Sequence, residues 1–214
     1  MNIHSILALA GVAGPLVLAV TDLSAASNDP AYSLVRNSIS SLALTSLGWL
    51  QTIGFLSIGL LVEIFVAGLL FNIKGARGFR FSIALLVFFG FGLLLIGAFR
   101  TDPAGVTNHT IEGAIHGFVA TTVFWLFPAA ILVIAPSLRH DASWRNIFIY
   151  TLAAAGLAVV LVLTLGILQD RVKWFGLLER LVVANMILWV EVAAIKLLRL
   201  SVRRGQAPGD PESR

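Results

Sequence analysis

The feature that most constrains the fold of this chain is a series of long apolar runs without charged side chains. One run extends from Phe81 to Phe99, and another from Gly113 to Leu138 contains no Asp, Glu, Lys or Arg. A helix rises about 1.5 Å per residue, so each run is long enough to cross a hydrocarbon core of about 30 Å. The sequence therefore predicts helices that span a membrane.

The composition agrees with this prediction and excludes other classes of protein. Hydrophobic residues make up 58% of the chain, charged residues 12%, and the mean hydropathy is +0.92, which is outside the soluble range. The absence of cysteine excludes disulfides, thiolate metal sites and cysteine nucleophiles. The pI near 10.1 would suit a nucleic-acid partner, but the basic residues stand at the ends of the apolar runs. We therefore expect no nucleic-acid partner and interpret the basic charge as a topology signal.

The order of apolar runs predicts an all-α fold, a polytopic membrane protein built as a bundle of six transmembrane helices. The spans expected are Ile3–Val20, Leu47–Phe71, Phe81–Phe99, Gly113–Ala135, Ile147–Leu168 and Gly176–Leu198. Pro128 is expected to break the fourth span near its end. Residues 1–200 would form one transmembrane domain, and residues 201–214, basic and then rich in Gly and Pro, a disordered cytoplasmic tail.

The distribution of basic residues predicts the orientation in the membrane. Six spans place both termini on one side, and most basic residues fall there: Lys74, Arg77, Arg80, Arg139, Arg145, Lys196, Arg199, Arg203, Arg204 and Arg214. The positive-inside rule then places both termini in the cytoplasm. We expect a multi-pass protein of the plasma membrane, with the connections after the first and third spans outside the cell.

The connection between the third and fourth spans concentrates the ionisable side chains. Ionisable groups at membrane depth are costly, and they usually line a cavity or pair with one another. Together with side chains from two other connections, this stretch predicts an outward-facing polar pocket. The candidate residues are Arg36, Arg100, Asp102, His109, Glu112, His116, Glu179 and Arg180.

The residue types in this set are compatible with three roles, and the sequence does not choose among them. In the first, the arginines pair with the acids in a network that ties the helices together. In the second, the pocket binds a lipid head group or a small anionic ligand, which makes membrane lipid the partner. The third is a metal-dependent intramembrane hydrolase that acts on a lipid-like substrate. The oligomeric state and whether the protein is an enzyme stay open.

The metal hypothesis rests on His116 and Glu112, which lie four residues apart and so share one face of a helix. Asp102 or His109 would complete a zinc site, and an open coordination position would activate water. No HExxH or other specific spacing accompanies these residues. No cofactor is therefore assigned, and zinc stays an alternative.

Two further acids lie at matching depths in different spans. Glu63 and Glu191 each follow the predicted outward start of their span by about four turns. If the second and sixth helices touch, the two carboxyls would share a proton, because like charges in contact do not both ionise cheaply. Otherwise each side chain extends to the cytoplasmic interface.

Three short motifs together resemble a known family. They are Arg36-Asn-Ser-Ile-Ser-Ser-Leu with Gly48-Trp49, then Phe99-Arg-Thr-Asp-Pro with Gly113-Ala-Ile-His-Gly, and finally Gly176-Leu-Leu-Glu-Arg. This combination resembles the prokaryotic six-helix integral membrane proteins of the domain-of-unknown-function 998 family, over roughly Ile3 to Leu200. Such proteins often carry an acid where this chain has Ser41. The resemblance implies a six-helix fold and a membrane location, and no established activity.

Overall fold

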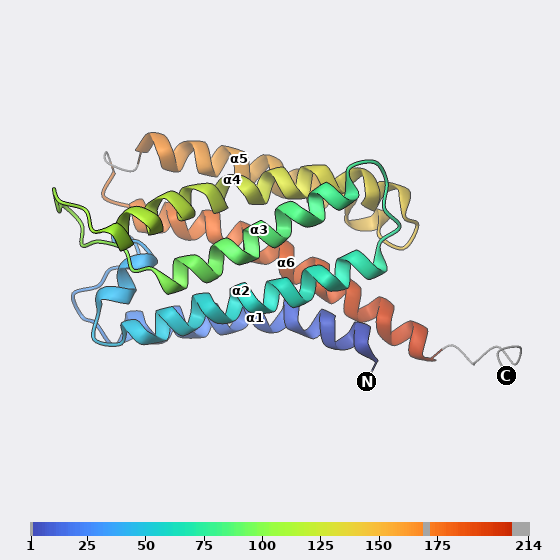
Figure 1. Cartoon of the computed structure of the whole chain (residues 1–214), viewed down its shortest axis with the longest axis horizontal. Helices are drawn as coiled ribbons and strands as arrows, with labels where there is room; N and C mark the ends of the chain where they lie inside the picture. The colour runs from blue at the N-terminus through green and yellow to red at the C-terminus, as the bar shows by residue number, and fades with distance from the viewer. Residues whose placement is uncertain (1, 169–171, 207–214) are drawn as a thin grey trace, which may run out of the picture.

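The computed structural model describes residues 2–168 and 172–206, which form six long helices and two short 3₁₀ helices (Figure 1). The elements are α1 Ile3–Ser27, η1 Ser40–Leu44, α2 Gly48–Asn72, α3 Phe79–Ala98, α4 Ile111–His140, η2 Arg145–Ile147, α5 Phe148–Leu168 and α6 Phe175–Gln206. All six long helices are long and apolar enough to cross a membrane. The predicted all-α bundle of six spans is confirmed.

Consecutive helices pack against each other along the chain, and α6 returns to pack against α1 (Figure 1). Large apolar side chains fill the interior, among them Phe65, Phe127 and Trp189, which are almost fully buried. The Phe127 ring lies 5.2 Å from the Phe89 ring and 5.8 Å from Trp189, between centroids. Close packing of this kind joins helices in a membrane, where lipid tails are as apolar as the side chains.

The bundle has two ends of different character (Figure 1). The N-terminus and the last turn of α6 lie together at one end, with the short connections 73–78 and 141–147; we call it the termini end. The opposite end carries the connections 28–47, 99–110 and 172–174, and we call it the long-loop end. The prediction that both termini lie on one side of the bundle is confirmed.

Three predicted boundaries differ from those of the structure. Helix α1 continues to Ser27, so Asp22 belongs to a helix rather than to a loop. Helix α4 runs through Pro128 and Pro136 to His140, and the predicted break at Pro128 is wrong. Neighbouring helices hold such a helix together although proline removes a hydrogen bond. Helix α6 extends past the predicted boundary at 200 to Gln206, and the tail prediction for 207–214 lies outside the described residues.

The proposed pairing of Glu63 with Glu191 finds no support in the packing. Glu63 lies against α3, where its Oε1 would be 2.7 Å from a Cβ placed on Gly90. Oε2 of Glu191 is buried and has no hydrogen-bond partner among the described residues. Across the part of the chain described, no hydrogen bond links the two carboxyls.

Candidate functional site

A groove opens at the long-loop end between α4, α5 and α6, with a volume of about 530 Å³. Its polar lining residues are Ser38, Ser40, Ser41, Thr101, Asp102, His116 and Glu179, and Thr121 deeper along α4. Its apolar part consists of Ala120, Phe124, Trp125, Val162, Leu165 and Phe175. We call this the amphipathic groove. Along α4 the lining extends from His116 to Trp125, about 13 Å deeper into the bundle.

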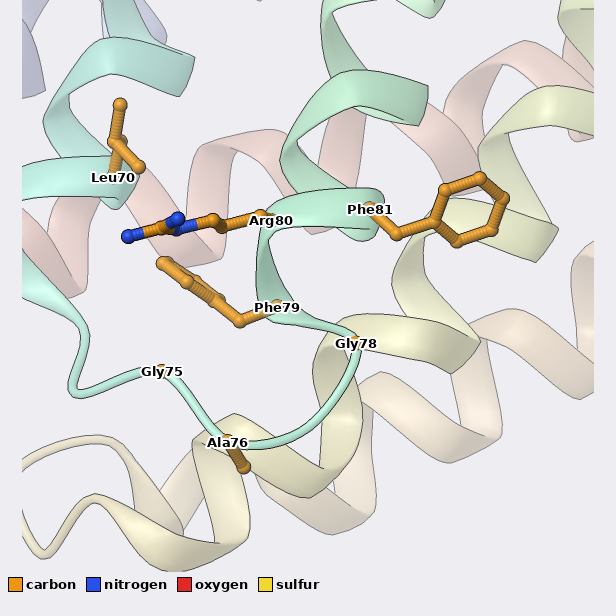
Figure 2. Close-up of a pocket in the computed structure, with 7 residues that line it drawn as sticks. All are labelled: Leu70, Gly75, Ala76, Gly78, Phe79, Arg80 and Phe81. Carbon is orange, nitrogen blue, oxygen red and sulfur yellow. The ribbon is translucent and has the colours of Figure 1, made fainter.

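A second hollow of comparable volume, about 490 Å³, lies at the termini end, and its lining is different (Figure 2). It is formed by Leu70 of α2, by residues of the α2–α3 connection and by the start of α3: Gly75, Ala76, Gly78, Phe79, Arg80 and Phe81. Its single charged side chain, that of Arg80, lies above the ring of Phe79 (Figure 2). Polar groups therefore converge in the amphipathic groove and not in this hollow.

His116 connects three segments at the polar part of the groove. Its side chain is buried, with 6% of the residue exposed. Nδ1 lies 2.8 Å from the carbonyl oxygen of Phe99, and Nε2 lies 3.0 Å from Oγ of Ser40. Because a carbonyl only accepts, Nδ1 carries the proton, and Nε2 of the neutral ring accepts from the Ser40 hydroxyl. The backbone at the end of α3 thus sets the tautomer of His116.

Glu179 holds the segment that carries Ser40 against α6. The residue is only 8% exposed, and its Oε2 accepts a hydrogen bond of 2.7 Å from the Ile39 backbone N–H. Two residues earlier in α6, the Leu177 N–H donates to the carbonyl of Val35 at 3.0 Å. The long connection between α1 and α2 is therefore fastened to the start of α6.

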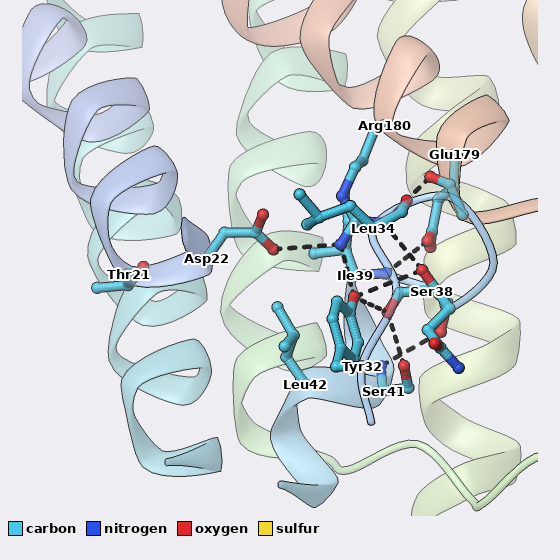
Figure 3. Close-up of polar contacts among 12 residues, drawn as sticks. Thr21, Asp22, Tyr32, Leu34, Ser38, Ile39, Ser41, Leu42, Glu179 and Arg180 are labelled. Atoms are coloured by element: carbon cyan, nitrogen blue, oxygen red, sulfur yellow. Dashed lines mark hydrogen bonds and ion pairs between the residues drawn. The ribbon is translucent and has the colours of Figure 1, made fainter. Parts of the chain in front are cut away.

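Arg180 fastens the same connection by its guanidinium group (Figure 3). Nη1 donates to the carbonyl oxygens of Leu34 and Asn37, both at 2.9 Å. Nη2 donates to the Tyr32 hydroxyl and lies 3.8 Å from Oδ1 of Asp22, which comes from the last turns of α1. The arginine thus joins α1, the long connection and α6. We call Asp22, Tyr32, Glu179 and Arg180 the clamp.

Tyr32 contributes a proton donor to the clamp. Its hydroxyl donates to the carbonyl of Ser38 at 2.7 Å while it accepts from Arg180. Burial raises the pKa of the Tyr32 phenol above its ordinary value, so the hydroxyl keeps its proton at neutral pH. The Arg180 guanidinium also lies over the Tyr32 ring, 5.6 Å from its centroid.

A close backbone approach at Gly176 makes the clamp possible. A Cβ atom placed on Gly176 would be 2.1 Å from the carbonyl oxygen of Asn37. Any side chain there would push the connection away from α6, and with it the carbonyl that Arg180 binds.

Asp102 organises the start of α4. Its Oδ1 accepts from the Thr110 hydroxyl at 2.7 Å, and its Oδ2 lies 3.1 Å from both the Thr110 N–H and Nδ1 of His109. Thr110 in turn caps α4, because its Oγ1 accepts from the Gly113 N–H at 2.9 Å. The hydrogen bond from the Thr110 hydroxyl is the main reason that the pKa of Asp102 lies below its ordinary value.

The structure brings some of the predicted site residues together and separates others. Those that line the groove are Asp102, His116 and Glu179. Arg100 lines a smaller hollow beside it, together with Ser40 and His116, and Arg180 lies in the clamp. Arg36, Arg100, His109 and Glu112 are exposed, and none of them lines the groove.

The ion pairs and the arrangement of His, Asp and Glu side chains bear on the network and metal hypotheses. Among the described residues, the ion pairs are Arg180 with Asp22 and, when His109 is protonated, His109 with Asp102. Among these pairs, Arg180 is the one predicted arginine that takes part, and its partner Asp22 is not one of the candidate acids. No group of three or more His, Asp or Glu side chains with metal-site geometry occurs in 2–168 and 172–206. His116 already uses both ring nitrogens, so we do not carry the zinc alternative further.

Sequence analysis missed Ser40, Asp22 and Tyr32 as site residues. Asp22 could have been identified if the first helix had been extended by two turns, because an acid would then lie within a spanning segment. Ser40 stood among several serines of one connection, and nothing local distinguished it from Ser38 or Ser41.

Comparison with protein families found one match over nearly the whole chain. The model described as "Protein of unknown function (DUF998)" matches residues 12–196. Comparisons with curated proteins and with solved structures found no match.

Proposed function

The chain belongs to this DUF998 family of unknown function, and we propose that it binds a membrane lipid in the amphipathic groove. The observation that carries the proposal is the division of the groove lining. Hydroxyl, carboxyl and imidazole groups stand at the long-loop end, and apolar side chains of α4 and α5 follow deeper in the bundle. A lipid has the same division into a polar head and an apolar chain.

The size and the chemistry of the groove fit this ligand class. A volume near 530 Å³ falls in the range of about 300–1,000 Å³ typical of small-molecule sites. Phe124, Trp125 and Val162 offer an apolar wall for an acyl chain. Arg100, which lines the adjoining hollow, would favour a head group with negative charge.

Two glycines support the proposal that the groove is open space rather than a packing seam. Gly117 of α4 and Gly166 of α5 both line it, and a Cβ atom at either position would meet no atom within 4 Å. A larger side chain at Gly117 therefore has room to extend into the groove without displacing a neighbouring helix.

Photo-crosslinking with a lipid tests the proposal directly. The probe is a phosphatidylglycerol with a diazirine in its acyl chain, in vesicles that contain the purified protein. We expect crosslinks concentrated on Phe124, Trp125 and Val162, and a loss of most of them in Gly117→Leu. The matched control is Gly156→Leu, since Gly156 also lies in a helix with nothing within 4 Å of an added Cβ but does not line the groove.

The pattern of crosslinks decides the outcome. Adducts spread evenly around the bundle and unchanged by Gly117→Leu would contradict a lipid site in the groove. Equal losses in Gly117→Leu and Gly156→Leu would show a general effect of a bulky residue on the helix surface and would also contradict it.

We further propose that the groove faces the outside of the plasma membrane. In support, the basic residues Lys74, Arg77, Arg139 and Arg145 all lie in or beside the short connections of the termini end. The positive-inside rule places that end in the cytoplasm. A cysteine at exposed Ala104 should react with an impermeant thiol reagent on intact cells, and one at exposed Ser143 should not. The reverse pattern would overturn the orientation.

A further inference from the structure

The hydrogen bond between Ser40 and His116 has the arrangement of a nucleophile and its general base. We propose that the amphipathic groove is an esterase site in which Ser40 attacks the carboxylic ester of a bound lipid and His116 takes the proton. This inference rests on the proposed function, because it assigns chemistry to the lipid that the groove binds.

The geometry of the pair is the first support. The Ser40 hydroxyl lies 3.0 Å from Nε2 of His116, within the range at which a base accepts a proton from a nucleophile. Nδ1 carries its proton toward the Phe99 carbonyl at 2.8 Å, so Nε2 is the basic nitrogen. Serine hydrolases require a third group that orients the histidine in this tautomer, and here a backbone carbonyl has that position.

The surroundings of the pair are the second support. Both side chains line the amphipathic groove, so an ester held with its acyl chain along Phe124 would have its carbonyl near the polar part of the groove. Glu179 acts as a positioning residue, since it binds the N–H of Ile39, the residue before the nucleophile. Arg100 lines the hollow next to Ser40 and His116, where a cation would stabilise the negative charge that develops on the carbonyl oxygen.

The reaction balances with the lipid ester and water as its two substrates. Oγ of Ser40 forms a bond to the carbonyl carbon while its proton passes to Nε2 of His116. The bond from that carbon to the alcohol oxygen then breaks, and His116 returns the proton to the leaving alcohol. Water, deprotonated by His116, attacks the acyl-serine, which releases the carboxylic acid and restores Ser40. No oxidant, reductant or metal takes part.

An alkyl fluorophosphonate tests the nucleophile in the full-length protein in detergent. Such a probe forms a phosphorus–oxygen bond with an activated serine and releases fluoride. We expect an adduct on Ser40 by mass spectrometry and none on any serine in Ser40→Ala. In His116→Gln the labelling rate should fall by roughly 10²–10⁴-fold, the usual contribution of a general base.

His116→Gln also separates catalysis from structure. Its amide has a donor for the Phe99 carbonyl and an acceptor for the Ser40 hydroxyl, so a purely structural link would survive while the base is lost. Matched controls are Ser27→Ala and His109→Gln. Ser27 is exposed at the same end of the bundle, and its hydroxyl bonds only to the Ser24 carbonyl. His109 is exposed and contacts Asp102. Both controls should label at the wild-type rate.

The outcomes distinguish this inference from the lipid-binding proposal. An adduct on Ser40 that requires His116 supports the esterase. Lipid crosslinks in the groove without a Ser40 adduct, or a Ser40 adduct that forms at the same rate in folded His116→Gln, overturn the esterase and leave lipid binding standing. Absence of both crosslinks and adduct overturns both. p-Nitrophenyl decanoate gives an independent readout, because hydrolysis should stop in Ser40→Ala although this variant stays folded.

Discussion

The two ends of the bundle differ in the charged residues they contain and in the contacts of these residues. At the long-loop end, Glu179 and Arg180 are drawn inward, and their charged groups bind the backbone of the α1–α2 connection. At the termini end, Arg77, Arg80 and Arg139 are exposed. The difference is that these two charged residues at the long-loop end bind backbone groups inside the bundle, while these three arginines at the termini end are open to solvent.

Buried polar groups at the termini end hold the two short connections against each other and against α1. Asp141, 5% exposed, accepts from the N–H groups of Lys74 and Ser143 at 2.9 and 2.8 Å. Asn72 accepts at its carbonyl from Nε1 of Trp144 at 3.1 Å, and its side chain contacts His4 at 2.9 Å. These bonds also join separate parts of the chain, namely the start of α1, the end of α2 and the α4–α5 connection, but none of the residues that make them lines the amphipathic groove.

The largest expected effect is the loss of the clamp in Arg180→Ala. The change leaves the Asp22 carboxylate without its ion-pair partner and the carbonyls of Leu34 and Asn37 without a donor. Both side chains of the ion pair are mostly buried, at 17% and 14% exposure, so we expect a loss of about 3–5 kcal/mol. The measurement is the melting temperature in detergent.

Two comparisons make this prediction specific. Arg204→Ala removes one hydrogen bond of 2.8 Å, to Asn72 at the termini end, and should cost only about 0.5–1.5 kcal/mol. A double-mutant cycle with Asp22→Asn should show strong coupling to Arg180, and a cycle with Glu112→Ala none. Equal losses of stability in Arg180→Ala and Arg204→Ala would contradict the proposed difference between the two ends.

Asp141→Ala should give the next largest effect and tests how the termini end is held. The substitution leaves the N–H groups of Lys74 and Ser143 without their acceptor. We expect a loss of about 1.5–3 kcal/mol in thermal unfolding. The control is Asp29→Ala, since Asp29 is only partly buried and its side chain accepts from one N–H group, that of Ala31. Similar effects of the two changes would show that Asp141 contributes no more than a surface turn residue.

Gly176→Ala tests the close backbone contact between α6 and the α1–α2 connection at the long-loop end. The added methyl group would overlap the Asn37 carbonyl, so the connection must shift, and we expect a loss of about 1–3 kcal/mol. Gly156→Ala adds the same group where nothing lies within 4 Å, and it should stabilise α5 by about 0.5–1 kcal/mol. A gain in melting temperature for both variants would contradict the close approach of the connection to α6.

The smallest effect concerns Asp102 and acid pH. Its pKa is lower in the folded protein than in the unfolded chain, so the stabilisation is present above the unfolded value of about 3.9 and is lost as pH falls through the folded value. Amide hydrogen exchange at Thr110 and Gly113 should therefore accelerate below about pH 4, beyond the intrinsic change with pH. In Asp102→Asn this extra acceleration should be absent. If it persists, another group is responsible.

The site was only partly accessible from the sequence. An ionisable residue near the end of an apolar run indicates a functional site. This rule points to His116, Asp102 and Glu179, and all three line the groove. Ser40 has no such signal, since a serine in a connection is ordinary, and only its distance to His116 sets it apart. Arg180 was expected to pair with the candidate acids, but the extension of α1 to Ser27 brings Asp22 to it instead.

The sequence by itself determined the number of spans, their approximate bounds and the common side of the two termini. These follow from local properties, because a hydrocarbon core requires each spanning segment to satisfy its own backbone within an uninterrupted apolar helix. Only the tertiary structure decided the contacts of the site, since His116 meets a serine 76 residues away and Arg180 a tyrosine 148 residues away. Such contacts depend on how the ends of packed helices bring the connections together, and no periodicity of a single segment encodes them.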